Sequence, residues 1–241
     1  MLLAMTKSPK IDCAVLSSVP LFRGVSMAVC VDALAVARRC SIPKDTAAFE
    51  QGDPADAFFL LAEGYMKAVQ TTAAGQQFVL HYINPGEIFG CVALMGAEQY
   101  PATAKAVADS VALSWSLNEV NLLIQRHPTL SSNALAGFGG RLLDMQARLR
   151  EIHTEPVEQR IAHALLGLVE RSGRQVEAGV AVDFLITRQD VAELAGTTLH
   201  TVSRTLSRWG REGIVVNGRQ KIVVADVARL ASIAAGTGDS P

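Results

Sequence analysis

The sequence predicts an α+β fold, in which a β-rich N-terminal half is joined by one long helix to a C-terminal half of short helices and a β-hairpin. Three features predict it: regularly spaced glycines between short apolar runs, an apolar 3.5-residue period, and two capped helices around a glycine. The chain has 241 residues, of which 49% are hydrophobic and 19% charged. This composition favours a folded chain of one large or two modest domains over a disordered one.

The N-terminal half is predicted to form a β-sandwich or β-roll. Its glycines recur every 11 or 12 residues, at Gly52, Gly64, Gly75 and Gly86. Short aromatic and aliphatic runs lie between them at 58–61, 65–69 and 78–83, a spacing typical of such folds. Residues 71–75 predict a hairpin turn, and residues 17–40, before the roll, are predicted to be helical.

One long helix is predicted from about residue 128 to residue 153. Its apolar residues are separated by alternating gaps of three and four, at Leu135, Phe138, Leu142, Met145, Leu149 and Ile152. This is the period of a coiled-coil seam, which predicts a dimer interface. Packing of the helix on its own domain remains the alternative, because the seam covers only about two and a half heptads.

A domain boundary is predicted at residue 154. The Thr154 hydroxyl is expected to cap a new helix, with Pro156 in the first turn, and Gly173 is expected to end that helix. The predicted N-terminal domain comprises residues 1–153, including the long helix, and the predicted C-terminal domain comprises residues 154–241.

Residues 186–210 predict a helix-turn-helix. Thr187 and Asp190 are spaced as a capping-box-like pair, and Gly196 permits the sharp turn before a second helix. Thr197 or Thr198 is expected to cap that second helix.

A hairpin is predicted to follow the second helix. Residues 213–224 place two β-branched runs around Asn217 and Gly218, which is a strong hairpin signal. A helix-turn-helix followed by such a hairpin is a winged helix, so the C-terminal domain is predicted to be one.

A helix-turn-helix places its second helix in the major groove, which predicts double-stranded DNA as a partner. Arg204 is the candidate for paired hydrogen bonds to guanine, and Arg188 for a phosphate contact. The predicted DNA contacts are Arg188, Gln189, Thr197, Thr198, His200, Thr201, Ser203, Arg204, Arg208, Arg219 and Lys221.

The distribution of charge supports this interpretation. The whole chain has a net charge of −1, whereas residues 197–221 hold five basic residues and one acidic residue, a local net charge of +4. The alternative is a solvated surface helix beside an ordinary hairpin.

Six motifs follow one another along the chain, at residues 20–22 (PLF), 49–56 (FEQGDPAD), 58–64 (FFLLAEG), 85–90 (PGEIFG), 187–190 (TRQD) and 201–204 (TVSR). Their order resembles that of the cyclic AMP receptor protein/fumarate-nitrate regulator (CRP/FNR) superfamily of bacterial transcription regulators. The resemblance implies a cyclic-nucleotide-binding-like β-roll as sensor, a long dimerisation helix and a C-terminal winged helix-turn-helix. It also implies a homodimer that reads a palindromic DNA site, and that contacts RNA polymerase if it is an activator.

The resemblance places an effector pocket at Gly90, Cys91, Val92, Pro101 and Ala102. Cyclic AMP receptors have a glutamate at the position of Cys91 and an Arg-Ser pair at the positions of Pro101 and Ala102. A cyclic phosphate needs a paired cation or several donors, which proline and alanine side chains lack. We therefore expect no high-affinity binding of cyclic AMP.

The oxygen-sensing branch of the superfamily is a poor match. Its iron–sulfur cluster is held by closely spaced N-terminal cysteines, whereas Cys13, Cys30 and Cys40 are 17 and 10 residues apart. We expect no iron–sulfur cluster, and small buried thiols instead.

Residues 101–104 (PATA) and 197–204 (TTLHTVSR) resemble the branch that responds to nitrogen oxides. That resemblance makes haem a candidate cofactor, and the residues that would bind a metal stay unknown. The candidate axial ligands are His81, His127, His153, His163, Met145 and Cys91.

Two other functional classes fit the sequence less well than a regulator. An enzyme with a nucleotide-binding regulatory domain is disfavoured, because no P-loop, GxSxG or HExxH motif occurs. A pure cyclic-nucleotide-binding module would leave the winged helix unexplained. The N-terminus lacks a secretory signal and no apolar stretch of 18 residues occurs, so a cytoplasmic protein without a membrane partner is expected.

Overall fold

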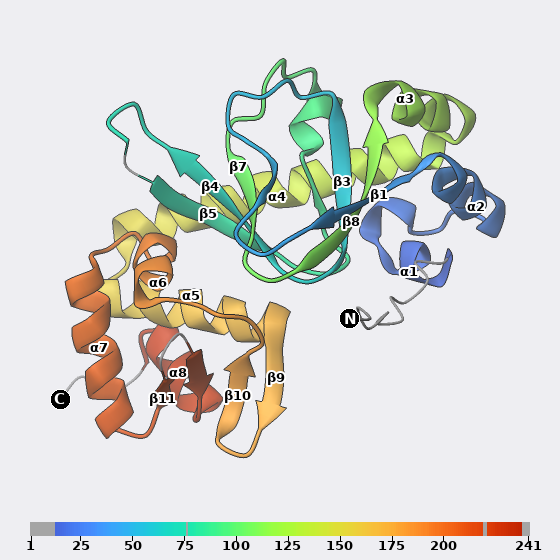
Figure 1. Cartoon of the computed structure of the whole chain (residues 1–241). Helices are drawn as coiled ribbons and strands as arrows, with labels where there is room; N and C mark the ends of the chain where they lie inside the picture. Colours follow the sequence, from blue (N-terminus) through green and yellow to red (C-terminus); the bar gives the residue numbers. More distant parts are fainter. Residues whose placement is uncertain (1–12, 76, 219–220, 238–241) are drawn as a thin grey trace, which may run out of the picture.

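The computed structural model describes residues 13–75, 77–218 and 221–237. It consists of a β-roll with helices at its N-terminal side, a long helix α4 that runs along the roll, and a C-terminal group of helices and strands beside β4 and β5 (Figure 1). The predicted α+β fold, with a β-roll, a long helix and a winged helix-turn-helix, is confirmed.

Two antiparallel sheets form the roll. The first has the order β1 (Arg38–Ile42), β8 (Ser110–Ser116), β3 (Ala57–Glu63) and β6 (Ile88–Phe89). The second has the order β2 (Ala47–Phe49), β7 (Thr103–Ala106), β4 (Met66–Thr71) and β5 (Gln77–Ile83). Residues from both sheets, including Leu61, Met66 and Ile83, form one buried apolar core between them. The turn predicted at residues 71–75 joins β4 to β5.

Helices cover one end of the roll. They are α1 (Cys13–Ser18), the 3-10 turn η1 (Pro20–Phe22), α2 (Met27–Val36) and α3 (Leu117–Arg126). The prediction of helix over 17–40 is wrong at its C-terminal end, because residues 38–40 pair with β8 as part of β1. A second 3-10 turn, η2 (Cys91–Met95), follows β6.

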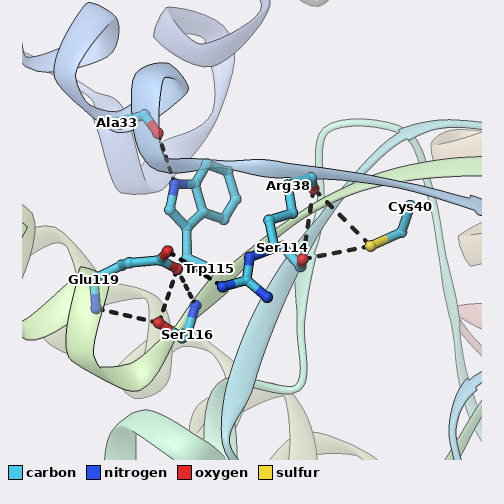
Figure 2. Close-up of polar contacts among 7 residues, drawn as sticks. All are labelled: Ala33, Arg38, Cys40, Ser114, Trp115, Ser116 and Glu119. Carbon is cyan, nitrogen blue, oxygen red and sulfur yellow. Dashed lines mark hydrogen bonds and ion pairs between the residues drawn. The ribbon is translucent and has the colours of Figure 1, made fainter.

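Trp115 anchors these helices to the first sheet. Its side chain is buried, its ring stacks on Phe58 at 5.0 Å, and its indole Nε1 donates a hydrogen bond to the Ala33 carbonyl at 2.8 Å. Figure 2 shows this bond beside the capping box of α3, in which the Ser116 amide donates to Glu119 at 2.7 Å. The hydrogen bond from the Ser116 amide holds the pKa of Glu119 below its usual value.

Helix α4 (Pro128–Thr154) matches the predicted long helix, and α5 (Val157–Ser172) follows it. The prediction that Thr154 caps α5 is wrong, because the Thr154 hydroxyl donates to the Arg150 carbonyl at 2.8 Å within α4. Pro156 occupies the N-cap position of α5, and Gly173 occupies its C-cap as predicted.

The C-terminal part combines three helices with one sheet. The helices are α6 (Arg188–Leu194), α7 (Leu199–Arg211) and α8 (Val227–Ala234). The sheet has the order β11 (Val215–Gly218), β12 (Lys221–Val224), β10 (Gly179–Val182) and β9 (Gly173–Val176). The hairpin of β9 and β10 has no counterpart among the predicted elements.

The predicted wing hairpin is present as β11 and β12, but Asn217 and Gly218 do not form its turn. Asn217 pairs with Ile222 and Gly218 with Lys221, so both predicted turn residues belong to β11. Register fixed by the sheet thus overrides the local Asn-Gly signal. Among the described residues, no helix has both the length and the apolar character needed to cross a bilayer.

Replacing Trp115 with Phe tests the anchor between α2 and the roll. Trp115→Phe keeps the ring stacking but leaves the buried Ala33 carbonyl without its donor, so we expect the free energy of unfolding to fall by about 1–3 kcal/mol. Urea unfolding followed by circular dichroism measures this. Leu122→Ala, at an exposed residue of α3, is the control and should change stability by less than about 0.5 kcal/mol. Equal stability of Trp115→Phe and the parent would show that the bond contributes nothing.

Candidate DNA-binding surface and effector cavity

The helix-turn-helix is built from local capping bonds. The Thr187 hydroxyl accepts a hydrogen bond from the Asp190 amide at 3.1 Å, and Asp190 Oδ2 accepts one from the Thr187 amide at 2.9 Å, so the predicted capping pair is present. Gly196 has φ +59°, which permits the turn after α6. Of the two threonines considered, Thr198 caps α7, where its hydroxyl accepts from the Thr201 amide at 3.2 Å.

Helix α7 is held by an apolar inner face. Val202, Leu206 and Trp209 are fully buried and belong to the core shared by α5, α6 and α8. The Trp209 indole Nε1 donates to Glu158 Oε1 of α5 at 3.0 Å. Burial of this face fixes which side of α7 is turned outward.

The structure places most of the predicted DNA contacts at the surface. His200 and Arg204 are exposed on α7, Ser203 and Thr201 are half-buried, and Lys221 is exposed on β12. On the preceding segment, exposed residues are Gln189 and Thr198, and half-buried ones are Arg188 and Thr197. The Gln189 side-chain amide also donates to Glu193 at 2.8 Å. The outward face of α7 therefore presents the guanidinium of Arg204 and the imidazole of His200 together.

Two of the predicted DNA contacts, Arg208 and Arg219, differ from the others. Arg208 is predicted to face DNA, but its guanidinium pairs with Glu158 of α5 and lies 3.8 Å from Glu212. The spacing of residues within α7 could not predict this ion pair, because Glu158 belongs to a different helix. Arg219 lies outside the described residues.

An apolar cavity of about 320 Å³ lies between the roll and α4. All five predicted pocket residues, Gly90, Cys91, Val92, Pro101 and Ala102, line it. Side chains that the sequence analysis did not assign to the pocket complete its walls, among them Phe49, Leu80, Phe89 and Tyr100. Their strands could be predicted, but which residues of one sheet meet those of the other depends on the closure of the roll.

Close packing of aromatic rings shapes one wall of the cavity. Phe49 stacks on Tyr100 with ring centroids 3.6 Å apart, and the Tyr100 hydroxyl donates to the Ala57 carbonyl at 2.5 Å. Burial raises the pKa of Tyr100. Gly90 has φ +70°, and a Cβ atom there would lie 3.2–3.3 Å from Phe49, Phe59 and Tyr100, so glycine suits the position in both conformation and space.

The predicted dimer seam follows α4. Leu135, Leu142 and Met145 are 72%, 58% and 65% exposed, and Phe138 packs partly on the N-terminal core. Leu143, which the seam did not include, is also exposed. The side chains of Leu149 and Ile152 lie outside the described part of the structure. Phe138, Leu142 and Met145 also line the cavity, so α4 brings two predicted sites together.

The candidate haem ligands are scattered. His127 pairs with Asp32 at 3.5 Å and His163 with Glu155 at 3.4 Å, whereas His153 is exposed near the end of α4. His81, Cys91 and Met145 line the cavity. Within the described ranges, no three His, Cys, Asp or Glu side chains gather closely enough to hold a metal ion.

Polar contacts join the roll to the helix-turn-helix. Lys67 Nζ of β4 donates to Asp190 Oδ1 of α6 at 2.9 Å, and the Val79 amide of β5 donates to Glu193 Oε2 at 2.7 Å. Val69, Val79 and Tyr82 of the roll belong to the same apolar core as α5, α6 and α7. The two predicted domains therefore share a core rather than meeting through a linker.

Asp190 has an unusual environment for a carboxylate. Its burial would raise its pKa, but the hydrogen bonds from Lys67 and Thr187 outweigh burial and lower the pKa below its ordinary value. Burial also raises the pKa of the neighbouring Tyr82, with a further contribution from the charge of Asp190. The ionised carboxylate therefore both caps α6 and attaches it to β4.

Two family models match the chain. A cyclic nucleotide-binding domain matches residues 39–127, which contain the roll, and a Crp-like helix-turn-helix domain matches residues 159–233. The cyclic AMP receptor protein of Thermus thermophilus is 33% identical over 217 residues, covering 90% of this chain and 97% of the relative. The transcriptional activator protein anr of Pseudomonas aeruginosa is 24% identical over 231 residues, covering 95% and 94%.

Solved structures show the same fold. The Thermus thermophilus catabolite activator protein is 32% identical, with a TM-score of 0.52 over 91% of this chain and 100% of that chain. FixK2 from Bradyrhizobium japonicum is 21% identical, with a TM-score of 0.72 over 86% and 99%.

A cyclic-nucleotide-binding roll joined to a Crp-like helix-turn-helix defines a DNA-binding transcription regulator with an effector-binding domain. The chain belongs to the Crp/Fnr family of transcription regulators.

Lys67→Met tests the attachment of α6 to the roll. The variant leaves a mostly buried Asp190 without its cation, so we expect a loss of about 1–3 kcal/mol in the free energy of unfolding at neutral pH. A carboxyl with a lowered pKa stabilises the fold above its unfolded pKa, and this contribution disappears as the pH falls through the folded value. The difference from the parent should therefore shrink below about pH 4.

Urea unfolding at several pH values measures this difference. Lys44→Met, the same substitution at an exposed residue of the loop before β2, is the matched control and should have little effect at any pH. A Lys67→Met deficit that stays constant down to low pH would mean that the ion pair is not its cause.

Proposed function

We propose that the protein is a homodimeric, sequence-specific DNA-binding regulator whose DNA affinity is switched by an effector at its sensor domain. The observation that carries this proposal is the double role of α4. Leu142 and Met145 line the cavity and also lie on the exposed apolar seam of α4. A ligand that moves these side chains would alter both the seam and the helix that leads into α5.

The exposed apolar seam supports the dimer. Leu135, Leu142, Leu143 and Met145 are all more than half exposed, and such a row on one helix typically marks an interface. A two-fold dimer would present two copies of α7 to a palindromic site. RNA polymerase is the further partner if the protein activates transcription, and the cytoplasm is the location that we propose for it.

Arg204 is proposed to read a guanine, supported by its exposure on α7. Arg204→Ala should weaken binding to the preferred site by about 1–3 kcal/mol and relax the preference at that base pair. Fluorescence anisotropy with duplexes varied at each half-site position measures both effects. Lys221→Ala, on the wing, is the control and should weaken binding to all sequences about equally. An unchanged guanine preference in Arg204→Ala would refute the assignment.

His200 is proposed to contact the adjacent base pair. Neutral imidazole can donate or accept a hydrogen bond, whereas the protonated ring only donates. The pair next to the arginine-read guanine should therefore be less strictly specified than one read by a glutamate, which accepts from cytosine.

A nitric-oxide or redox signal is the effector that we propose, in place of cyclic AMP. The sequence resemblance at residues 101–104 and 197–204 supports the nitrogen-oxide branch. The Thermus relative is named a cyclic AMP receptor protein. We depart from that name because Cys91, Pro101 and Ala102 offer no cation to a cyclic phosphate.

Haem is the group proposed to bind nitric oxide in such a sensor. The walls of the cavity are mostly apolar, as the surroundings of a haem macrocycle need to be. His81, Cys91 and Met145 are the candidate ligands at these walls. His127 and His163 are not among the residues that line the cavity, which disfavours those two residues. Haem would supply the iron, and this chain would supply a ligand and an environment that limits water.

A regulator of another small ligand is the second candidate. The volume of the cavity favours it, because about 320 Å³ lies within the range of sites for small organic molecules, about 300–1,000 Å³. A regulator that is active without any ligand is the remaining alternative.

A mobility shift with a library of palindromic promoter sites distinguishes these effectors. Haem-reconstituted protein should change its DNA affinity when nitric oxide is added anaerobically, and micromolar cyclic AMP should change nothing. A micromolar cyclic AMP affinity would overturn the effector assignment while leaving the DNA-binding proposal intact. DNA binding that no condition alters would support constitutive activity.

A further inference from the structure

The cavity between the roll and α4 is much larger than a diatomic gas needs. A cavity of about 150 Å³ with apolar walls takes up benzene, so a volume of about 320 Å³ has room for more than one ring. Its walls combine the rings of Phe49, Phe89 and Tyr100 with small or aliphatic side chains such as Ala102 and Ala104. The size and the lining suit a compact organic molecule.

Polar groups at the walls are already engaged in the protein. The Tyr100 hydroxyl donates to the Ala57 carbonyl at 2.5 Å. The Thr103 hydroxyl donates to Glu50 Oε2 at 2.8 Å and accepts from the Gln51 amide at 3.0 Å. A ligand therefore meets mainly carbon and sulfur at these walls.

Charge is missing from the described lining as well. No Lys, Arg, Asp or Glu side chain contributes to the described walls. An anion or cation transferred from water into such a site would lose its hydration and meet, as the ionisable nitrogen side chain of the described lining, only the imidazole of His81, at a cost of several kcal/mol. The lining thus disfavours ligands whose charge would be buried inside the cavity, such as phosphorylated ones.

We propose that this cavity binds an uncharged, largely apolar, ring-containing organic molecule in contact with Phe138, Leu142 and Met145 of α4. The proposal rests on the proposed function for the consequence of binding, because ligand contact with α4 would bias the dimer seam. The binding itself can be tested without DNA. The competing occupant is the α4 helix of a second copy, whose side chains could fill the same space.

N-phenyl-1-naphthylamine is a suitable probe, because it is uncharged, aromatic and fluorescent in apolar surroundings. The full chain should bind it with one site per protomer. Its anionic analogue, 1-anilinonaphthalene-8-sulfonate, has closely similar rings and should bind at least about tenfold more weakly, because the sulfonate finds no cation. Equal or tighter binding of the anionic probe would overturn the proposal.

Two variants locate the probe. Ala102→Leu fills the cavity from the roll, and Leu142→Trp fills it from α4, where Leu142 is 58% exposed in one protomer. Each should lower probe affinity at least about tenfold. Ala74→Leu, in the exposed turn between β4 and β5, makes a matched substitution outside the cavity and should leave binding unchanged. Probe binding that survives both filling variants would place the ligand elsewhere and refute the proposal.

The outcomes separate this inference from the proposed function. Probe binding that leaves DNA affinity unchanged would support the ligand class and contradict the effector role. No probe binding by a dimer that still responds to nitric oxide would overturn the ligand class and leave the proposed function standing. No probe binding by wild type, with binding gained in a monomeric Leu135→Glu variant, would identify the partner helix as the occupant and also refute the proposal.

Discussion

The orientation of the helix-turn-helix depends on the contact between α6 and the β4–β5 hairpin. Asp190 performs two tasks there, since one carboxylate oxygen caps α6 and the other accepts the Lys67 hydrogen bond. Capping fixes where α6 begins, and the ion pair fixes where that beginning lies on the roll. The position of α7, the helix proposed to read DNA, follows, because α6 and α7 share a buried core and a tight turn at Gly196.

The contact between α6 and the β4–β5 hairpin has an apolar part and a polar part, and the two differ in how strongly they fix the orientation of the helix-turn-helix. The apolar part, with Val69, Val79 and Tyr82, favours burial of the interface without strongly specifying direction. The directional part consists of the Lys67–Asp190 pair and the bond from the Val79 amide to Glu193. Changes that preserve the apolar contact while exchanging these polar bonds could reorient the helix-turn-helix at modest free-energy cost. An interface of this kind suits a protein with two arrangements of its domains.

Local signals in the sequence are sufficient for much of the fold. The spacing of glycines predicts the roll, and Thr187, Asp190 and Gly196 predict the helix-turn-helix, because capping and turns involve residues a few positions apart. The same reasoning fails where a distant partner decides. Arg208 pairs with Glu158, 50 residues earlier, and Lys67 pairs with Asp190, 123 residues later. The cavity shows the intermediate case: family motifs indicate the residues around Gly90 and Pro101, but the facing residues on α4 follow only from the packed structure.

The placement of Arg208 also changes how the charge of the C-terminal domain should be understood. Residues 197–221 have a net charge of +4, but the half-buried Arg208 is paired with Glu158 of α5. Among the described residues of this segment, Arg204, Arg211 and Lys221 remain exposed. Because phosphate contacts set the nonspecific affinity and its dependence on salt, the pairing of Arg208 with Glu158 would make both smaller than the formal charge implies. In the proposed dimer, affinity for a particular site would come from base contacts made twice, so the geometry of that dimer would matter more than the total charge. A sensor that acts on α4 would control that geometry directly.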